Sequence, residues 1–336
     1  MMSQNKNVRA EMFYLVGSYS VQVKAIAAAV NLKLADCIGD DRRSSRELAQ
    51  LVGCDEAALC RLLRALTCTG IFREEAGYYH NTPRSDTLRR DRMDNIADWA
   101  RMFGCGLIDH GLEALDQATR TGLPQFERRM GTPFFDYLEH NSEMSSMFSA
   151  AMTNFSYGMA ENAVAAWSFA DARRIIDIGG GHGKMLKTIL ESAPGACGVL
   201  FDRQQVIDEI MENNLLDSED ITLVAGNFFN PVPHGGDIYI LRHILHDWPD
   251  DKCLVILRNI RNAMPDRGKL LILEHVITSG DTPEMGKYLD LIMLTSLGGR
   301  ERGIDEFRTL LEQAGMRLNR VVTPEGGHSI IEALPA

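Results

Sequence analysis

The feature that most constrains the fold is a short apolar run that ends in an acid and then breaks into glycines. Residues 174–178 are rich in β-branched side chains, residues 179–183 are mostly glycine, and a helical pattern begins at Lys184. A strand, a tight glycine turn and a helix start are typical of an open α/β sheet where it holds a nucleotide-like cofactor. Glycine lets the backbone approach a ligand closely, and a helix N-terminus offers free N–H groups.

Strand and helix patterns alternate through the C-terminal half of the chain. Further strand patterns fall at 197–201, 221–225, 237–241 and 269–275, and helical periodicity separates the first of them. This alternation is the signature of a doubly wound, mostly parallel sheet. We therefore expect an α/β, Rossmann-like catalytic domain over residues 166–336.

The N-terminal part has a different pattern. Helical periodicity runs from about residue 10 to 38, a capping box at 44–47 and Asp55 open two short helices, and 71–80 has the pattern of a hairpin. This order is typical of a winged helix, which we place at residues 1–100. These residues hold 14 Lys/Arg and 13 Asp/Glu, a charge too balanced to neutralise phosphates. A mainly helical dimerisation or substrate-covering domain is favoured over a DNA-binding one.

Residues 101–165 form a third region, helical in pattern and rich in Met and Phe. Most of these side chains are expected to pack in a core. Methionine is flexible and polarisable, so it also suits a wall that contacts a flat apolar ligand, and we assign that role to Met152. The region is interpreted as a helical linker that covers the substrate.

Composition limits the classes of function. The formal charge of −11 disfavours nonspecific binding to nucleic acids and to anionic membranes. The seven cysteines are scattered and include no C-x-x-C pair, which favours reduced thiols. No Cys/His cluster has zinc-ligand spacing, so we expect no metal. The polar N-terminus and the lack of an uncharged apolar run of spanning length predict a soluble, cytoplasmic protein without a membrane partner.

The spacing of acids and glycines indicates the kind of cofactor. From Asp177 the pattern is D-x-G-x-G-x-G, whereas dinucleotide sites carry G-x-G-x-x-G. An acid beside the turn repels a pyrophosphate and suits a cationic, amine-bearing ligand such as S-adenosylmethionine. A second strand ends at Asp202, whose carboxylate can bind a ribose diol. That second feature does not separate NAD from S-adenosylmethionine.

Three later segments complete an ordered set of motifs. They are 226–229 (G-N-F-F), 245–248 (L-H-D-W) and 298–302 (G-G-R-E-R). Together with the glycine turn, the chain closely resembles the S-adenosylmethionine-dependent small-molecule O-methyltransferases, which include plant caffeate and flavonoid enzymes and bacterial natural-product enzymes. The resemblance covers nearly the whole chain. It implies an aromatic substrate and a homodimer, in which the front domain helps to close the partner's acceptor pocket.

The resemblance also implies roles for individual residues in cofactor binding. Gly179 and Gly181, with Asp177 beside them, match the cradle for the methionine part, and Asp202 matches the ribose-binding acid. Asn227 stands where the family commonly has an aspartate that contacts the adenine amine; its amide oxygen can still accept that bond, without the charge. The remaining cofactor contacts implied by the resemblance are Phe228, Arg242 and Ser156.

His246 resembles the catalytic base of the family. A neutral phenol is a poor nucleophile, and a histidine that titrates near neutrality can take its proton during methyl transfer. Glu301 and Glu274 match the acids that flank this histidine and stabilise the imidazolium. Met293 matches a substrate-wall methionine, and Asp247 is assigned either to the substrate side or to capping the helix that begins near Pro249. His243 and His275 are expected to be packing or surface residues.

Several rival functions remain open on this sequence. The same scaffold also supports N-methylation, or reactions such as hydroxylation, decarboxylation and pericyclic steps that use the bound cofactor only as a positive charge. A cofactor-sensing DNA-binding regulator is disfavoured by the charge balance, and NAD-dependent reduction is disfavoured by the glycine spacing. O-methylation is favoured because the other reactions have less need of a base flanked by acids.

Overall fold

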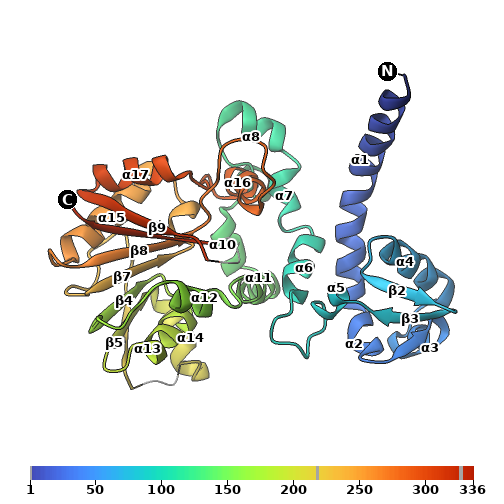
Figure 1. Cartoon of the computed structure of the whole chain (residues 1–336), viewed down its shortest axis with the longest axis horizontal. Helices are drawn as coiled ribbons and strands as arrows, with labels where there is room; N and C mark the ends of the chain where they lie inside the picture. Colours follow the sequence, from blue (N-terminus) through green and yellow to red (C-terminus); the bar gives the residue numbers. More distant parts are fainter. Residues whose placement is uncertain (1, 217–218, 325–327) are drawn as a thin grey trace. The chain divides into compact units, whose positions relative to one another are not determined.

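The computed structural model describes residues 2–216, 219–324 and 328–336, which form two compact units (Figure 1). The first unit runs to His110 and includes Phe135–Tyr157. The second comprises Gly111–Phe134 and Gly158–Ala336. The helical region that we expected at 101–165 is therefore divided between the two units.

The first unit begins with the predicted winged-helix pattern. Its elements are α1 (Met2–Asn31), α2 (Leu34–Ile38), β1 (Arg42–Ser44), α3 (Ser45–Val52), α4 (Glu56–Cys68), β2 (Phe72–Glu75) and β3 (Tyr78–Asn81), and the strands pair in the order β1-β3-β2. Ser44 and Glu47 form the capping box of α3, and Asp55 accepts a hydrogen bond from the N–H of Ala58 at the start of α4. Both caps confirm the predicted helix starts, because each satisfies N–H groups that lack partners in the first turn.

Short helices follow the hairpin. In the first unit they are α5 (Pro83–Asp86), α6 (Ala97–Gly104) and most of α10 (Phe134–Glu139), followed by α11 (Ser142–Phe155). α7 (Asp109–Leu112) lies at the unit boundary, and α8 (Leu115–Thr121), α9 (Phe126–Met130) and α12 (Met159–Ala166) belong to the second unit. Trp99 of α6 stacks on Phe155 of α11 with ring centroids 4.6 Å apart, which ties these two helices of the first unit together.

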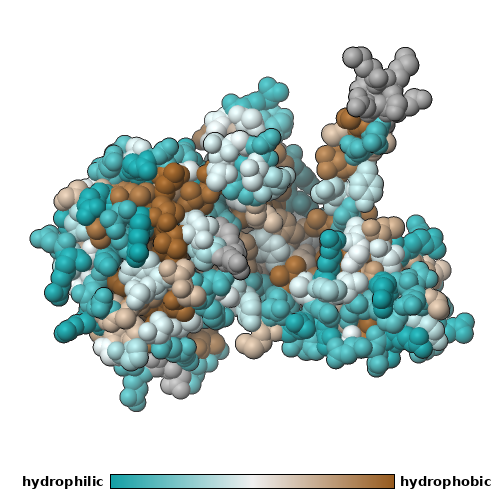
Figure 2. All heavy atoms as spheres, in the orientation of Figure 1, coloured by the Kyte–Doolittle hydropathy of each residue, from teal (hydrophilic) through white to brown (hydrophobic). Residues whose placement is uncertain are grey.

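Much of α1 is apolar and exposed, as the brown side chains along it in Figure 2 show. The segment Asn7–Asn31 is long and apolar enough to cross a membrane by length and composition, and 17% of its most apolar stretch is buried. The sequence-based expectation of no membrane-spanning segment required an uncharged apolar run, and Arg9, Glu11 and Lys24 interrupt this one; the segment qualifies only by the looser measure of length and mean hydropathy. An exposed apolar surface of this extent marks an interaction site. The side chains more than half exposed are Val8, Met12, Phe13, Tyr14, Val16, Tyr19 and Val21.

The second unit is built on a seven-stranded sheet in the order β6-β5-β4-β7-β8-β10-β9. The strands are β4 (Arg174–Ile178), β5 (Cys197–Asp202), β6 (Ile221–Ala225), β7 (Ile238–Arg242), β8 (Lys269–Glu274), β9 (Met316–Val322) and β10 (Ser329–Pro335). The first five are parallel, as predicted, whereas β10 runs antiparallel to both β8 and β9. The sequence analysis did not identify β9 and β10.

Helices cover both faces of this sheet (Figure 1). They include α13 (Lys184–Ser192), α14 (Gln204–Asn213), α15 (Asp250–Ala263) and α17 (Ile304–Gln313), whereas α16 (Met285–Ser296) packs against α8 and α9. The central strands are buried on both sides, and two apolar clusters fill the layers between sheet and helices. The chain moves outward from β4 to β6 and then returns to β7 on the other side of β4. This reversal makes the carboxyl ends of β4 and β7 the expected place for a ligand.

Candidate active site

The glycine turn after β4 has the backbone that its sequence predicts. Gly179 and Gly181 have φ angles of 69° and 56°, in the left-handed region that favours glycine. The N–H of Gly181 donates to Asp202 Oδ2 at 2.8 Å. A Cβ on Gly180 would lie 2.6 Å from Asp177 Oδ2 and 2.3 Å from Leu200, whereas one on Gly181 would meet nothing within 4 Å. The turn is therefore packed tightly beneath Gly180, which the sequence analysis did not single out, and is open beside Gly181.

Asp177 lies beneath this turn as a buried carboxyl group. Its residue is 1% exposed, and neither side-chain oxygen accepts a hydrogen bond from the described residues. Burial raises the pKa of Asp177 to about 7, although the charge of Arg242 opposes the rise. A buried acceptor without donors is costly unless a ligand supplies them. The group therefore fits the positively charged ammonium of an amine-bearing cofactor such as S-adenosylmethionine.

The other predicted cofactor residues lie around the same turn. Asp202 ends β5, and its two oxygens accept the N–H groups of Gly181 and Arg203. Asn227 follows β6, and its Oδ1 accepts the N–H of Phe229 at 2.9 Å. The oxygen that we expected to face adenine is thus already engaged within the chain's own turn. A Cβ on Gly179 would approach the ring of Phe228 to 3.8 Å, so that ring borders the turn.

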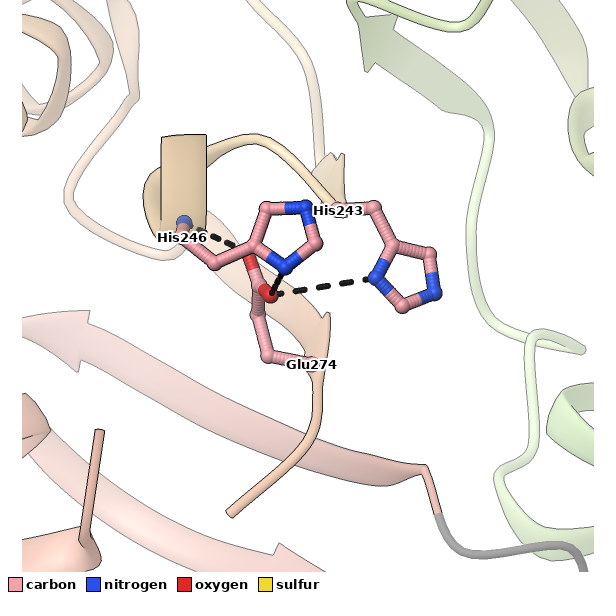
Figure 3. Close-up of side chains that lie close together, drawn as sticks. All are labelled: His243, His246 and Glu274. Atoms are coloured by element: carbon pink, nitrogen blue, oxygen red, sulfur yellow. Dashed lines mark hydrogen bonds and ion pairs between the residues drawn. The ribbon is translucent and has the colours of Figure 1, made fainter. Parts of the chain in front are cut away.

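The predicted catalytic histidine lies on a short turn that Glu274 organises. The 3₁₀ turn η1 (Leu245–Asp247) follows β7, and Glu274 is the last residue of the neighbouring strand β8. Glu274 Oε1 accepts the N–H groups of Ile244, Leu245 and His246 at 3.1, 2.9 and 3.4 Å. Oε1 of Glu274 therefore holds the backbone of the turn. The other carboxylate oxygen, Oε2, is directed at the rings of His246 and His243 (Figure 3).

The ring of His246 is surrounded by three carboxylates. Its Nδ1 lies 3.0 Å from Glu301 Oε1 and 3.4 Å from Glu274 Oε2, while its Nε2 lies 3.4 Å from Asp247 Oδ1. Burial lowers the pKa of this ring, but the charges of Glu274, Asp247 and Glu301 outweigh burial and raise the pKa to about 10. The arrangement stabilises an imidazolium strongly.

Asp247 does not cap the helix that follows the turn. The N-cap of α15 is Pro249, and no side chain accepts a hydrogen bond there. Asp247 lies instead against His246, and burial raises its pKa to about 6 although the neighbouring imidazolium opposes the rise. The capping alternative was wrong because the two residues Trp248 and Pro249 separate Asp247 from the first turn of the helix.

The G-G-R-E-R segment fixes the position of Glu301. A Cβ on Gly299 would lie 2.0 Å from the carbonyl oxygen of His246, so glycine is required for this approach. The N–H of Glu301 donates to Asp290 Oδ1 of α16 at 2.8 Å. The fully buried Arg302 donates to the carbonyl oxygens of Leu245 and Trp248, each at 2.8 Å. Gly299 and Arg302 were visible in the motif, but sequence reasoning used only its glutamate. Nothing in the motif indicated Asp290.

His275 is buried and His243 is half-buried beside the site, so neither lies on the open surface. The ring centroid of His243 lies 5.1 Å from that of His246, and its Nδ1 lies 3.9 Å from Glu274 Oε2. His275 is 8% exposed. One ligand atom from each of His243, His246 and Glu274 lies within 4.8 Å of the others (Figure 3). The sequence analysis looked for ligands that are closely spaced in the chain. It did not find this cluster because Glu274 ends β8, whereas both histidines follow β7.

The remaining predicted residues are distributed over both units. Met293 is half-buried on α16, three residues after Asp290 and therefore on the same side of the helix. Arg242 ends β7, and burial lowers the pKa of its guanidinium. Met152 lies on α11 and Ser156 at its C-terminal end, in the first unit. Their assignments to substrate and cofactor stay predictions.

Two family models match the chain. A model described as an O-methyltransferase dimerisation domain matches residues 15–91, and one described as an O-methyltransferase domain matches residues 112–317, more than half of the sequence. The chain belongs to the O-methyltransferase family. The dimerisation match includes the exposed apolar part of α1 from residue 15 onward, which accounts for an interaction surface there.

Individual relatives of this O-methyltransferase span almost its full length. Phenazine O-methyltransferase PhzM from Lysobacter antibioticus is 38% identical over 317 residues, covering 93% of this chain and 92% of that protein. An 8-amino-8-demethylriboflavin N,N-dimethyltransferase from Streptomyces davaonensis is 33% identical, covering 88% of each. A crystal structure of an O-methyltransferase from neocarzinostatin biosynthesis, in complex with S-adenosylmethionine and 2-hydroxy-5-methyl naphthoic acid, is 30% identical with a TM-score of 0.75, covering 94% and 96%.

Proposed function

We propose that this O-methyltransferase transfers a methyl group from S-adenosylmethionine to a phenolic hydroxyl of a planar aromatic natural product, with His246 as general base. The acceptor class is supported by the phenazine and naphthoic acid named for its relatives. The observation that carries the base assignment is the position of the His246 ring within 3.4 Å of the carboxylates of Glu274, Asp247 and Glu301.

The residues around the glycine turn suit S-adenosylmethionine, which supplies a methyl group on a positively charged sulfonium. Gly179 and Gly181 would let the backbone contact the methionine part, and Asp177 would pair with its ammonium. Asp202 would bind the ribose while it keeps the turn in place. Asn227 and Phe228 would bind the adenine, with Arg242 and Ser156 as further cofactor contacts.

His246 has the geometry and basicity that removal of a phenolic proton requires. When Nδ1 of the neutral ring carries the proton and donates a hydrogen bond to Glu301 Oε1, Nε2 is left as the acceptor for the phenolic proton. The pKa of about 10 matches that of a phenol, also about 10, so a proton is shared between the two at little cost. Because the ring is charged at neutral pH, the substrate complex must release one proton before transfer, and we expect kcat to rise with pH.

The acceptor would lie against Asp247, Met293 and Met152. The half-buried Asp247 carboxyl group lies beside Nε2 of His246, where the reacting hydroxyl must come, and the two methionines would contact the flat ring system. The exposed apolar side chains of α1 would form the interface of a homodimer, in keeping with the dimerisation domain. We place the enzyme in the cytoplasm, without a nucleic-acid partner and without a membrane.

The proposal is tested with His246→Ala and, as a matched control, the exposed His234→Ala. Phenols related to hydroxyphenazines and hydroxynaphthoates are incubated with S-adenosylmethionine, and methylated products are counted by mass spectrometry. We expect His246→Ala to lower kcat by about 10²- to 10⁴-fold. Calorimetry should give it an unchanged affinity for S-adenosylmethionine, and His234→Ala should behave like the wild type. Full turnover in His246→Ala would refute the base assignment.

N-methylation of an aromatic amine is the second candidate, because the riboflavin-type relative is named as an N,N-dimethyltransferase. An amine carries its own lone pair and needs no deprotonation before attack. Matched phenol and aniline substrates therefore separate the two functions. Turnover of the aniline alone, insensitive to His246→Ala, would favour N-methylation.

A further inference from the structure

The proposed mechanism uses His246 and Glu274 but leaves the neighbouring His243 without a role. Figure 3 shows that both rings are directed at the same carboxylate, from the end of β7 and the turn that follows it. His246 Nδ1 and His243 Nδ1 lie 3.4 and 3.9 Å from Glu274 Oε2, and the ligand atoms of all three residues lie within 4.8 Å of one another. Two imidazoles and one carboxylate form a recurrent ligand set for transition metals.

We propose that His243, His246 and Glu274 form a binding site for a divalent transition-metal ion of the Zn²⁺ type. A tetrahedral Zn²⁺ holds nitrogen and oxygen ligands at about 2.0–2.2 Å, which places them about 3.4 Å apart. The separation between His246 Nδ1 and Glu274 Oε2, 3.4 Å, matches this value, and that between His243 Nδ1 and Glu274 Oε2, 3.9 Å, is longer by about 0.5 Å. The nitrogens of His243 and His246 lie within 4.8 Å of each other, and side-chain rotations that move them by about an ångström would bring them into range. A water molecule would be the fourth ligand.

The carboxylate is held in place before any metal arrives. Glu274 is fully buried, and its Oε1 accepts three backbone N–H groups of the catalytic turn. Its Oε2 accepts no hydrogen bond from the described residues. A fixed, buried oxygen of this kind suits a single bond to a cation. The nearby carboxylates of Glu301 and Asp247 add negative charge, which further favours an ion of charge +2.

The ligand types select the ion. Mg²⁺ and Ca²⁺ prefer an all-oxygen environment, which two imidazoles do not provide. Zn²⁺, Co²⁺ and Ni²⁺ bind imidazole nitrogen well, and the three-ligand set with an open fourth position is the pattern of histidine–carboxylate zinc sites. We therefore expect Zn²⁺ and Co²⁺ to bind and Mg²⁺ not to bind.

The metal would inhibit methyl transfer, a consequence that rests on the proposed function of His246. An ion on Nδ1 takes the lone pair there, so the neutral ring must carry its proton on Nε2. Nε2 then has no lone pair for the phenolic proton, and the hydrogen bond from Nδ1 to Glu301 is lost. The metal ion would thus take the place of the proton on Nδ1 of His246, and this exchange involves no oxidation or reduction.

Binding is measured on the chelator-treated full-length protein, independently of turnover. Calorimetry with Zn²⁺ and visible absorption with Co²⁺ are applied to the wild type, to His243→Ala and to the surface control His234→Ala. We expect one tight site in the wild type and in His234→Ala, and at least about a hundredfold weaker binding in His243→Ala. Exposed thiols such as Cys68, Cys105 and Cys197 also bind soft metals, so the site is defined by the difference between these proteins.

Turnover is then measured with Zn²⁺ at ten times its dissociation constant, each variant being compared with its own metal-free rate. Mass action predicts roughly tenfold inhibition of the wild type and little inhibition of His243→Ala. If His243→Ala is poorly folded, His243→Gln replaces it. No wild-type binding of Zn²⁺ or Co²⁺, or equal binding by the His243 variants, would overturn the site. Tight binding with unchanged turnover would overturn the inhibition, whereas binding by a protein that methylates no phenol would count against the proposed function alone.

Discussion

Replacing Glu301 by glutamine isolates one of the charges that make His246 basic. The Glu301 side chain is 1% exposed, and its Oε1 lies 3.0 Å from Nδ1 of the ring. Glutamine keeps the size of the side chain and an oxygen that accepts the ring N–H. The substitution therefore removes the charge of the pair with little change in packing. We expect a lower pKa for His246 and a smaller free energy of unfolding at low pH.

The size of the change follows from the geometry. An opposite charge within about 4–6 Å shifts a pKa by roughly 1–3 units, so the pKa of His246 should fall from about 10 to about 7–9. Each unit corresponds to about 1.4 kcal/mol of differential stabilisation. The free energy of unfolding should therefore fall by about 1.4–4 kcal/mol at pH values where the ring is charged in both the folded and the unfolded protein. This estimate is of the order of a quarter of the stability of a typical domain.

The sign of the pH dependence is fixed by linkage. The folded pKa of His246 is raised above its unfolded value of about 6.5, so its stabilisation is fully present below pH 6.5 and is lost as the pH rises toward 10. Glu301→Gln should thus destabilise the protein most near pH 6. The difference from the wild type should narrow as the pH approaches 10, where the ring is neutral in both proteins.

Two measurements check this prediction. Nitrogen-15 NMR of histidine-labelled protein gives the pKa of His246, and urea unfolding at pH 6, 8 and 9.5 gives the free energy of unfolding. Asp305→Asn is the matched control, because it removes one negative charge from a side chain that is 86% exposed and belongs to the next helix. A pKa of His246 that is equal in both variants, or a destabilisation that does not vary with pH, would refute the reasoning.

Three further predictions concern the supports of the site. Gly299→Ala should lower kcat by about a hundredfold or more, because its Cβ would lie 2.0 Å from the His246 carbonyl oxygen. Gly303→Ala, whose Cβ would come no closer than 3.4 Å to any atom, is the control, and equal kcat values for the two variants would contradict the close approach. Arg302→Met should lower the free energy of unfolding by about 2–5 kcal/mol in urea, since buried carbonyl oxygens lose their donors; a loss below about 1 kcal/mol would count against that role. Asn227→Asp should lower the dissociation constant for S-adenosylmethionine by up to about tenfold in calorimetry, because a carboxylate keeps the turn and offers a second acceptor; weaker binding would contradict it.

The positions of most elements could be predicted from the sequence because local signals determine them. The capping box at Ser44 and the glycine turn after β4 act within a few residues, and the structure confirms both. The sequence analysis missed β10 because a short apolar run does not by itself distinguish a strand from a buried helical segment, and it missed β9 because Arg317, Asn319 and Arg320 interrupt its apolar pattern. β10 pairs with β8, which ends more than fifty residues earlier in the chain, and β9 pairs in turn with β10, so only the assembled sheet identifies them.

The sequence by itself determined the family motifs, the order of the parallel strands along the chain and the residue types of the site. Tertiary structure decided what surrounds the histidine. Glu274 ends β8, His246 lies in the turn η1 after β7, and Glu301 lies in the segment after α16; only the parallel pairing of β7 with β8 brings the first two together. The same pairing places His243 beside them and turns Asp247 toward the ring. Charge and burial depend on distances across the fold, and for that reason the raised basicity of His246 could not be read from its motif.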